Sequence, residues 1–600
     1  MLTAARVNVH NSAMRAAFLS ALALLAACGG ATRPETAAPP REVAAAAPAR
    51  PAPQPLIASG WALAGRAKPV EGEHAMVVSG HPLASAVGLE ILERGGNAVD
   101  AGVAVGFALA VVYPIAGNIG GGGFMVIREA KGTVRTLDFR EAAPRRATHD
   151  MYLDAGGSPT DASLTGHLSA GVPGSVAGLY EAQRRHGRLP WAEVVAPAIR
   201  LAREGYVLDA GDSRGIALEA HRLRRFPASR SQFLVDGQAP APGTRFVQLL
   251  LASTLQQIAD SGARAFYRGR IADLIVKEMQ RGHGLITRED LADYRPRWRS
   301  PIELSYRGYT IYTMAPPSGG GITLGEILNV MEGYRPLQPF GSAALMHLEA
   351  EAMRRAFTDR NTYLGDPDFV DMPVERLLSK SYAAKLRAEI DPQRATPSAP
   401  FAGARREGTE TTHYSVVDAD GTAVSCTTTL NDDFGSAVTV TGAGFLLNDE
   451  MDDFAVAPGK PNLYGLIQGE ANAIAPGKRM LSAMTPSIVL DPAGKLFLVL
   501  GSPGGSRITT AVYQVISNVI DHDMTLADAL GAPRLHHQGL PDTVYLERGG
   551  FVQAAIDSLK AMGHEVGVWG FKTSVNAIQR TAAGWVGVSD PRRGGGAAGY

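Results

Sequence analysis

The spacing of apolar positions changes along the chain. Between residues 170 and 285 apolar side chains recur with helical spacing, whereas after Thr411 they form short runs separated by Asp-Gly or Pro-Ala-Gly turns. The first pattern predicts helices and the second predicts strands joined by hairpins. The expected helices are 84–94, 101–112, 174–186, 191–204, 246–259 and 506–521, and the expected strands are 412–417, 423–430, 485–490, 496–500, 543–547, 574–580 and 584–589.

This arrangement indicates an α+β protein in which one sheet packs on another and helices cover the outside. The pattern alone does not separate this architecture from other α+β layouts. Because 600 residues exceed the usual limit of one core, two domains or one large layered domain are expected. Residues 101–112 are apolar all round but too few to span a bilayer, so they predict a buried core helix.

The N-terminus has the pattern of an export signal. Basic residues precede the apolar run 16–27, which ends in a Leu-Ala-Ala-Cys sequence at Cys28. Residues 1–28 therefore resemble a bacterial lipoprotein signal in which Cys28 carries the lipid; the alternative is an ordinary cleaved signal. The segment 29–70 begins rich in Ala and Pro and is expected to act as a tether. The expected location is the periplasm, or the outer membrane of a Gram-negative bacterium through a lipid anchor.

Charge and cysteine content exclude several classes of partner and site. The chain has 58 basic and 58 acidic residues without a long run of one sign, so nucleic acid is not an expected partner. Cys28 and Cys426 cannot form a disulfide framework. His536 and His537 are adjacent and would point to opposite faces of a strand, without a third ligand at suitable spacing. We expect neither a metal nor another cofactor.

The segment that begins at Thr411 carries the candidate chemistry. Alternation along strand 423–430 and its end places Thr427, Thr429 and Asn431 on one face, where polar groups suit a site better than a core. If the chain were cleaved before Thr411, that residue would combine a hydroxyl nucleophile with its own α-amine, whose pKa of about 8 lets it accept the hydroxyl proton.

Several motifs then carry a family resemblance. TTHYSVVDADGTAVSCTTTLNDDFG from Thr411, followed by GAGFLLNDEMDDF, resembles the start of the small subunit of γ-glutamyltransferases, also called γ-glutamyltranspeptidases. These are self-cleaving N-terminal nucleophile hydrolases. The resemblance extends from about residue 75 to 600 and includes DFREAAP at 138–144, PGKPNLYG at 458–465, KRMLSAMTP at 478–486, GSPGGSRI at 501–508 and PRLHHQ at 533–538.

The resemblance implies a four-layer αββα sandwich built from a large subunit, 71–410, and a small subunit, 411–600. The two subunits would arise by self-cleavage of the Glu410–Thr411 bond and remain together as a heterodimer. The implied activity transfers the γ-glutamyl group of glutathione or related compounds to water, amino acids or peptides through a Thr411 acyl-enzyme. The alternatives are a glutaryl or cephalosporin acylase, a poly-γ-glutamate hydrolase, and an unprocessed lipoprotein that only binds γ-glutamyl compounds.

The resemblance also implies site residues. Thr429 would hold the Thr411 amine, while Thr427 is a weaker candidate for the same role. Gly504 and Gly505 end a predicted strand and start a helix, so their N–H groups would stabilise an oxyanion. The remaining implied roles are in substrate binding: Arg140 and Ser482 for the α-carboxylate, Asp453 with Glu450 and Asn431 for the α-ammonium, and Tyr464 as a lid over the substrate.

One position departs from the family pattern. The family commonly has two serines in the Leu-Ser-Ser-Met sequence, whereas this chain has Ser482 followed by Ala483. Loss of one neutral hydrogen bond costs about 0.5–1.5 kcal/mol. The change indicates either weaker glutamyl binding or a different acyl group such as glutaryl, which lacks the ammonium. Retention of Asp453 argues against the glutaryl interpretation.

Overall fold

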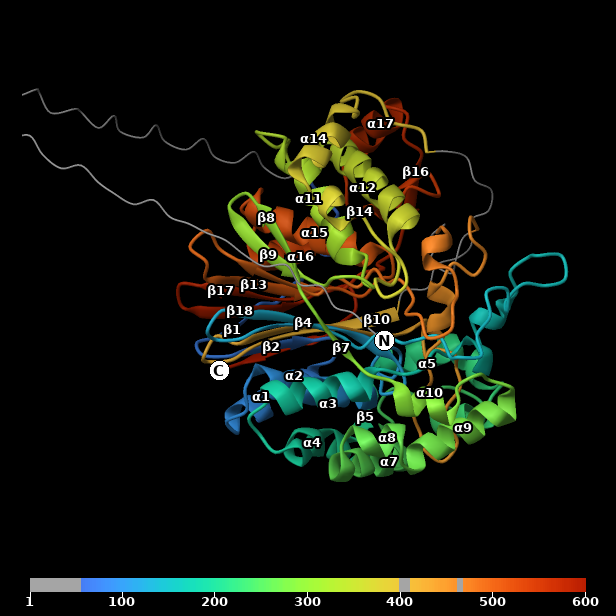
Figure 1. Cartoon of the computed structure of the whole chain (residues 1–600). Coiled ribbons are helices and arrows are strands. Elements are labelled where there is room, and N and C mark those ends of the chain that lie inside the picture. The colour runs from blue at the N-terminus through green and yellow to red at the C-terminus, as the bar shows by residue number, and fades with distance from the viewer. Residues whose placement is uncertain (1–55, 399–409, 461–467) are drawn as a thin grey trace, which may run out of the picture. The chain divides into compact units, whose positions relative to one another are not determined.

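The computed structural model describes residues 56–398, 410–460 and 468–600 (Figure 1). The expected signal 1–28, with Cys28, lies outside the described residues, as do most of the tether and the lid residue Tyr464. Among the described residues, no helix combines the length and apolar character needed to cross a membrane.

Two seven-stranded sheets form the centre of the described structure, and every strand pairing within them is antiparallel. The first sheet has the order β1 (Val70–Gly72), β18 (Gly584–Ser589), β17 (Asn576–Thr581), β13 (Leu496–Gly501), β12 (Ser487–Leu490), β9 (Tyr309–Thr313) and β8 (Ile302–Tyr306). The second has the order β19 (Gly596–Gly599), β2 (Met76–Ser79), β10 (Glu410–Val417), β11 (Ala423–Asn431), β3 (Gly122–Arg128), β4 (Val134–Asp138) and β7 (Arg297–Arg299).

Helices cover the outer faces of both sheets (Figure 1). Those on the side of the second sheet are α1 (Pro82–Glu93), α2 (Ala98–Val112), α3 (Ser175–His186), α4 (Trp191–Glu204), α5 (Ala210–Leu223), α6 (Pro227–Phe233), α7 (Leu249–Ser261), α8 (Ala263–Tyr267), α9 (Arg270–Gly282) and α10 (Arg288–Asp293). Those on the side of the first are α11 (Gly320–Glu332), α12 (Ala343–Tyr363), α13 (Val374–Leu377), α14 (Lys380–Ala388), α15 (Arg507–Ile520), α16 (Leu526–Gly531) and α17 (Gln553–Ala561).

Separate apolar clusters hold these layers together. One lies between the two sheets and includes Val78, Val126, Ile488 and Trp585, all buried. A second joins the second sheet to the helices around α2, and a third joins the first sheet to α11, α12 and α15. Burial of apolar surface on both faces of each sheet is what stabilises stacked layers. The expected four-layer αββα sandwich is confirmed.

Each sheet combines strands from before and after Thr411. In the second sheet β10 pairs with β2 on one side and β11 on the other, while β11 pairs with β3. In the first sheet β12 pairs with β9, and β18 pairs with β1. Neither part of the chain therefore forms a complete sheet without the other.

The expected helices all occur, with ends shifted by a few residues. For example, α2 begins at Ala98 instead of residue 101, because Asn97 is the N-cap and its side chain accepts from the N–H of Val99 and Asp100. The strands before Thr411 were not predicted. β3 is buried at six of its seven positions, so it lacks the alternation that marks a half-exposed strand.

Shorter elements complete the description. A three-stranded sheet contains β14 (Leu535–His536), β15 (Val544–Glu547) and β16 (Val566–Trp569), and β5 (Tyr206–Val207) pairs with β6 (Arg245–Phe246). The short 3-10 turns are η1 (Asp161–Ser163), η2 (His167–Ser169), η3 (Glu450–Asp453) and η4 (Glu470–Asn472).

Candidate active site

The β10–β11 ladder places two threonines opposite each other. Thr411 pairs with Thr429, and the Thr411 hydroxyl donates to the Thr429 Oγ1 at 3.4 Å. The ladder register shifts between Glu410 and Thr411, so Thr411 follows a β-bulge. A bulge re-aims a side chain at the end of a strand. The predicted nucleophile and its predicted partner are thus adjacent.

Asn431 closes this end of β11. Its backbone N–H donates to the Thr429 Oγ1 at 2.8 Å, and its side-chain Nδ2 donates to the Asp449 carbonyl at 3.1 Å. Asn431 has a φ of 84°, a left-handed conformation that Asn tolerates better than most residues. The strand therefore turns away at Asn431 while the Thr429 hydroxyl stays fixed beside Thr411.

His413 and Thr427 lie next along the same faces and bond to each other. The His413 Nδ1 lies 2.9 Å from the Thr427 Oγ1, and its Nε2 lies 3.0 Å from the Ser415 Oγ. Burial lowers the pKa of His413 to about 3, so the ring is neutral. His413 is thus a packing residue, and the Thr427 hydroxyl contacts this ring.

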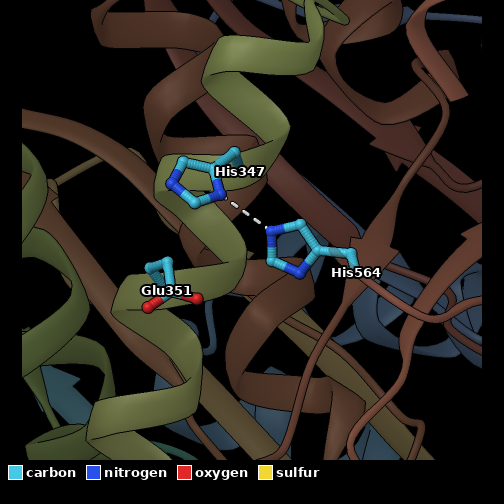
Figure 2. Close-up of side chains that lie close together, drawn as sticks. All are labelled: His347, Glu351 and His564. Atoms are coloured by element: carbon cyan, nitrogen blue, oxygen red, sulfur yellow. Dashed lines mark hydrogen bonds between the residues drawn. The ribbon is translucent and has the colours of Figure 1, made fainter. Parts of the chain in front are cut away.

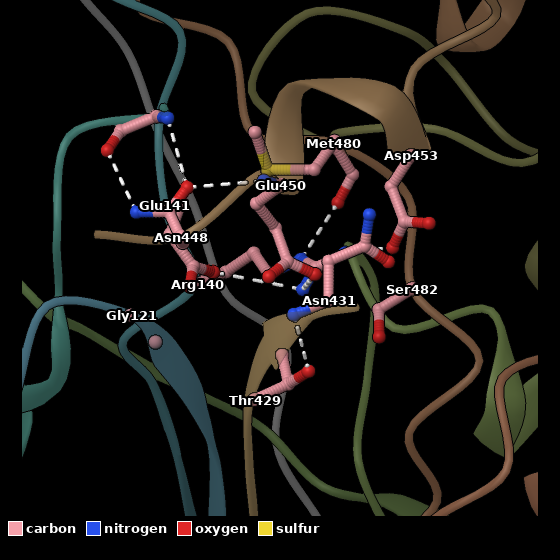
Figure 3. A network of polar contacts seen from close by, with 12 residues as sticks. Gly121, Arg140, Glu141, Thr429, Asn431, Asn448, Glu450, Asp453, Met480 and Ser482 are labelled. Carbon is pink, nitrogen blue, oxygen red and sulfur yellow. Dashed lines mark hydrogen bonds and ion pairs between the residues drawn. The ribbon is translucent and has the colours of Figure 1, made fainter. Parts of the chain in front are cut away.

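Arg140 is the centre of a buried ionic network (Figure 3). It lies two residues after the end of β4 and is fully buried. Its Nη1 donates to Glu450, its Nη2 donates to Asp453, and its Nε donates to the Met480 carbonyl at 3.3 Å. Both carboxylates come from the single turn η3, so one short segment supplies two partners for one guanidinium.

Burial and charge oppose each other in this network. Burial raises the pKa of Glu450 and of Asp453, while Arg140 acts to lower both. Burial also raises the pKa of Glu141, the residue after Arg140, to about 7. A buried guanidinium among several carboxylates is costly to assemble and is typical of a binding site for a charged ligand.

The paired glycines lie between β13 and α15. Gly504 has a φ of 133° and Gly505 a φ of 57°, both in regions that favour glycine. A Cβ on Gly504 would lie 2.9 Å from the Thr573 Cγ2, so this position is also tightly packed. The segment leads into the N-terminus of α15, where N–H groups favour negative charge.

One small pocket brings most of the predicted residues together. Its lining includes Thr411, Thr429, Asn431, Arg140, Glu450, Asp453, Ser482 and Gly505. Gly504, which precedes Gly505 in the sequence, is not among the lining residues. The sequence interpretation missed Arg360 of α12, which also lines the pocket with Ala483, Met484, Ser506 and Ile508. No sequence signal separates Arg360 from the other charged residues of this helix.

The adjacent histidines His536 and His537 have separate partners. The His536 Nδ1 lies 2.9 Å from the Thr510 Oγ1, and the His537 Nε2 lies 3.3 Å from an Asp542 carboxylate oxygen. The two rings therefore do not share a ligand position. Another histidine cluster, which the sequence did not suggest, contains His347, Glu351 and His564 (Figure 2).

Hydrogen bonds and ion pairs already occupy this second cluster. The His347 Nε2 lies 2.7 Å from the Asp391 carbonyl and must donate to it, so its Nδ1 accepts from the His564 Nε2 at 2.8 Å. Glu351 pairs with Arg355 at 2.5 Å and with Arg354 at 3.3 Å. Two nearby guanidinium groups oppose a divalent cation, and we interpret the cluster as a structural link between α12 and the segment after α17.

Comparison with known proteins agrees with this geometry. A family model described as gamma-glutamyltranspeptidase matches residues 84–600. A glutathione hydrolase proenzyme of Pseudomonas sp. (strain A14) is 50% identical over 489 residues, covering 80% of this chain and 84% of its own length. A glutathione hydrolase proenzyme of Escherichia coli (strain K12) is 47% identical over 533 residues, with coverages of 87% and 91%.

A solved structure supports the fold independently. The crystal structure of a cephalosporin acylase from Bacillus halodurans superimposes with a TM-score of 0.79 at 29% identity, covering 89% of this chain and 97% of that one. The N-terminal nucleophile hydrolase architecture is therefore shared over nearly the whole described structure. From the family match and the extent of these similarities, the chain belongs to the gamma-glutamyltranspeptidase family.

Proposed function

We propose that the chain is a self-processed γ-glutamyltransferase and glutathione hydrolase. The observation that carries this proposal is the position of Thr411 beside Thr429, in a pocket that also contains the Arg140–Glu450–Asp453 network. A nucleophile and paired opposite charges in the lining of one pocket suit an acyl donor that also carries a zwitterionic group. The γ-glutamyl group has this shape.

Thr411 performs the covalent step in this proposal. Once it is the N-terminal residue, its α-amine takes the hydroxyl proton while Oγ1 attacks the γ-carbonyl carbon. Backbone N–H groups at Gly504 and Gly505 stabilise the negative oxygen of the tetrahedral intermediate. The amide C–N bond breaks, the leaving amine takes the proton, and a γ-glutamyl ester of Thr411 remains. Water or the amine of an amino acid or peptide then attacks the ester and releases Thr411.

Substrate recognition uses the two signs of charge in the pocket. Glu450, Asp453 and the Asn431 side chain supply acceptors for the α-ammonium, and Arg140 with Ser482 supplies donors for the α-carboxylate. In the free protein Arg140 pairs with the two acids. A bound zwitterion supplies a counter-ion to each side, so its entry does not leave a buried charge unpaired. Tyr464 is proposed to cover the bound substrate.

Processing at Glu410–Thr411 would divide the chain into the large subunit 71–410 and the small subunit 411–600. The same hydroxyl attacks the preceding carbonyl within one chain, where proximity makes the reaction efficient. The products stay associated because strands from before and after Thr411 are hydrogen-bonded neighbours in each sheet. We further propose that 1–28 directs export, that Cys28 carries a lipid, and that 29–70 tethers the enzyme to the outer membrane on its periplasmic side.

Replacement of Thr411 tests the function. Thr411→Ala should migrate as one uncleaved band on a denaturing gel and should not hydrolyse a γ-glutamyl anilide. Thr412→Ala is the matched control: its neighbouring hydroxyl is buried without a hydrogen-bond partner among the described residues, so both processing and turnover should persist. Two bands and turnover from Thr411→Ala would overturn the mechanism. A glutaryl anilide assayed in parallel distinguishes the acylase alternative.

A further inference from the structure

Arg360 is a second buried guanidinium in the same pocket. It comes from α12 and is only 2% exposed. Its Nη1 donates to the Asn361 Oδ1 at 2.9 Å, and its Nε has no hydrogen-bond partner among the residues that the structure describes. A buried cation with one neutral partner is unfavourable, since desolvation is not offset by a counter-charge. Such a group indicates that an external anion completes the site.

The backbone of Gly319 lies close to the Arg360 guanidinium. A Cβ on Gly319 would lie 3.2 Å from the Arg360 Nε and 3.3 Å from a Leu481 methyl carbon. Only a glycine therefore leaves ordinary van der Waals space for this guanidinium. The Gly319 N–H donates to the Ser482 carbonyl at 2.8 Å, which places Arg360 beside the Ser482–Ala483 segment.

The charges of the pocket are therefore asymmetric. Arg140 pairs with Glu450 and Asp453. Arg360, in contrast, lies within ion-pair distance of no carboxylate in the described part of the chain. Asp453 attracts Arg360 at longer range and Arg140 repels it, and burial lowers the pKa of Arg360 to about 10, which leaves it charged at neutral pH. The pocket therefore contains one cation shared by two acids and a second cation without a carboxylate partner.

We propose that Arg360 binds the α-carboxylate of the acyl donor and supplies the donor group that a serine at position 483 would otherwise provide. This inference rests on the proposed γ-glutamyl function and deepens it. It makes a free α-carboxylate a requirement for donor substrates, because only an anion at that position pairs the Arg360 guanidinium. Two oppositely charged groups also attract each other more strongly than a neutral hydroxyl, which Ala483 lacks, attracts a carboxylate.

The test combines a protein change with a substrate change. Arg360→Met and Arg360→Lys are assayed with γ-glutamyl anilide and with its analogue in which the α-carboxylate is a carboxamide. With the carboxylate substrate, Arg360→Met should raise KM about 10- to 100-fold with little change in kcat, and Arg360→Lys should recover part of the loss. With the carboxamide substrate, the wild-type and Arg360→Met proteins should have similar KM values.

Binding of L-glutamate, measured by calorimetry, gives a readout that does not depend on turnover. The wild-type protein should bind it and Arg360→Met should bind at least about 10-fold more weakly. Arg355→Met is the matched control, since Arg355 is on the same helix but pairs with Glu351 outside the pocket. Its KM and glutamate affinity should equal those of the wild-type protein.

Each alternative has a distinct outcome. Two outcomes would overturn the role of Arg360. In one, Arg360→Met raises KM equally for the carboxylate and carboxamide substrates; in the other, a folded and processed Arg360→Met protein has an unchanged KM for the carboxylate substrate. Melting temperature and the two-band pattern on a denaturing gel show whether the variant is folded. A wild-type protein that fails to hydrolyse γ-glutamyl anilide would instead reject the proposed function, because that assay does not depend on Arg360 being substituted.

Discussion

Thr411 and Thr429 face each other across the β10–β11 ladder with their hydroxyl oxygens 3.4 Å apart. The Thr429 oxygen is also fixed by the Asn431 backbone N–H at 2.8 Å. Thr429 is therefore held in place by the end of its own strand and can orient whichever polar group Thr411 presents. The pairing of Thr411 with Thr429 in the ladder therefore places a fixed hydroxyl beside the proposed nucleophile.

Removing the Thr429 hydroxyl should slow turnover. Thr429→Val keeps the shape and the β-branch but loses the oxygen that contacts Thr411, so kcat should fall about 10- to 100-fold while KM changes little. Steady-state kinetics with a γ-glutamyl anilide provide the measurement. Thr429→Ser keeps the hydroxyl and should retain most activity. An unchanged kcat in Thr429→Val would show that Thr429 has no role in orienting Thr411.

A serine at position 483 should improve donor binding. Ala483 lines the pocket, and a hydroxyl there would add one hydrogen bond from a neutral donor to the carboxylate, worth at least about 0.5–1.5 kcal/mol. Ala483→Ser should therefore lower KM for γ-glutamyl anilide by a few-fold to about tenfold without changing kcat. Ser482→Ala serves as the opposite change and should raise KM. A higher KM in Ala483→Ser would mean that this position is too crowded for the hydroxyl.

Adding a methyl group at Gly504 should impair the acyl transfer step. An alanine would have to adopt a φ of 133° and would place its Cβ 2.9 Å from the Thr573 Cγ2. The backbone would shift and misdirect the proposed oxyanion donors, so kcat should fall roughly 100-fold. Gly494→Ala, at a hairpin turn with open space around its Cβ, controls for strain at a positive φ. Normal kcat in Gly504→Ala would reject the oxyanion role.

Acid should destabilise the protein through buried neutral histidines. Burial, with a smaller effect of His347, lowers the pKa of His564 to about 4, against an ordinary value of 6.5. The unfolded chain therefore binds a proton that the folded chain does not between pH 6.5 and 4. Stability is full above pH 6.5 and is lost as the pH falls towards 4, by at most about 3 kcal/mol from this residue.

Thermal unfolding across this pH range measures the effect. His564→Gln should flatten the decline in melting temperature between pH 6.5 and 4, while His221→Gln, which changes an exposed histidine, should leave the decline unchanged. His413 and His81 are also neutral and buried, with pKa values lowered to about 3 and about 4, so part of the decline should persist in His564→Gln. If the melting temperature of His564→Gln declined with pH as steeply as that of the wild-type protein, His564 would not be a source of the acid destabilisation.

Several elements and site residues could be predicted because they depend on residues that are close in the sequence. The hairpin of β10 and β11 has β-branched strands and an Asp-Gly turn, and alternation alone places Thr427, Thr429 and Asn431 on one face. Gly504 and Gly505 stand between a strand and a helix in the sequence itself. β2 and β3 escaped prediction because burial on both faces removes their alternation.

The sequence by itself predicted Thr411 as the nucleophile and placed it on a strand, because the alternation of the 411–431 hairpin is local. The oppositely charged residues were predicted only through the resemblance of short motifs to those of the family. Only the tertiary structure decided which guanidinium is paired and which is not. Arg354, Arg355 and Arg360 all belong to α12, and only packing beside Gly319 and Ser482 directs Arg360 into the pocket. Burial and pairing depend on neighbours distant in sequence, so periodicity along one helix does not reveal them.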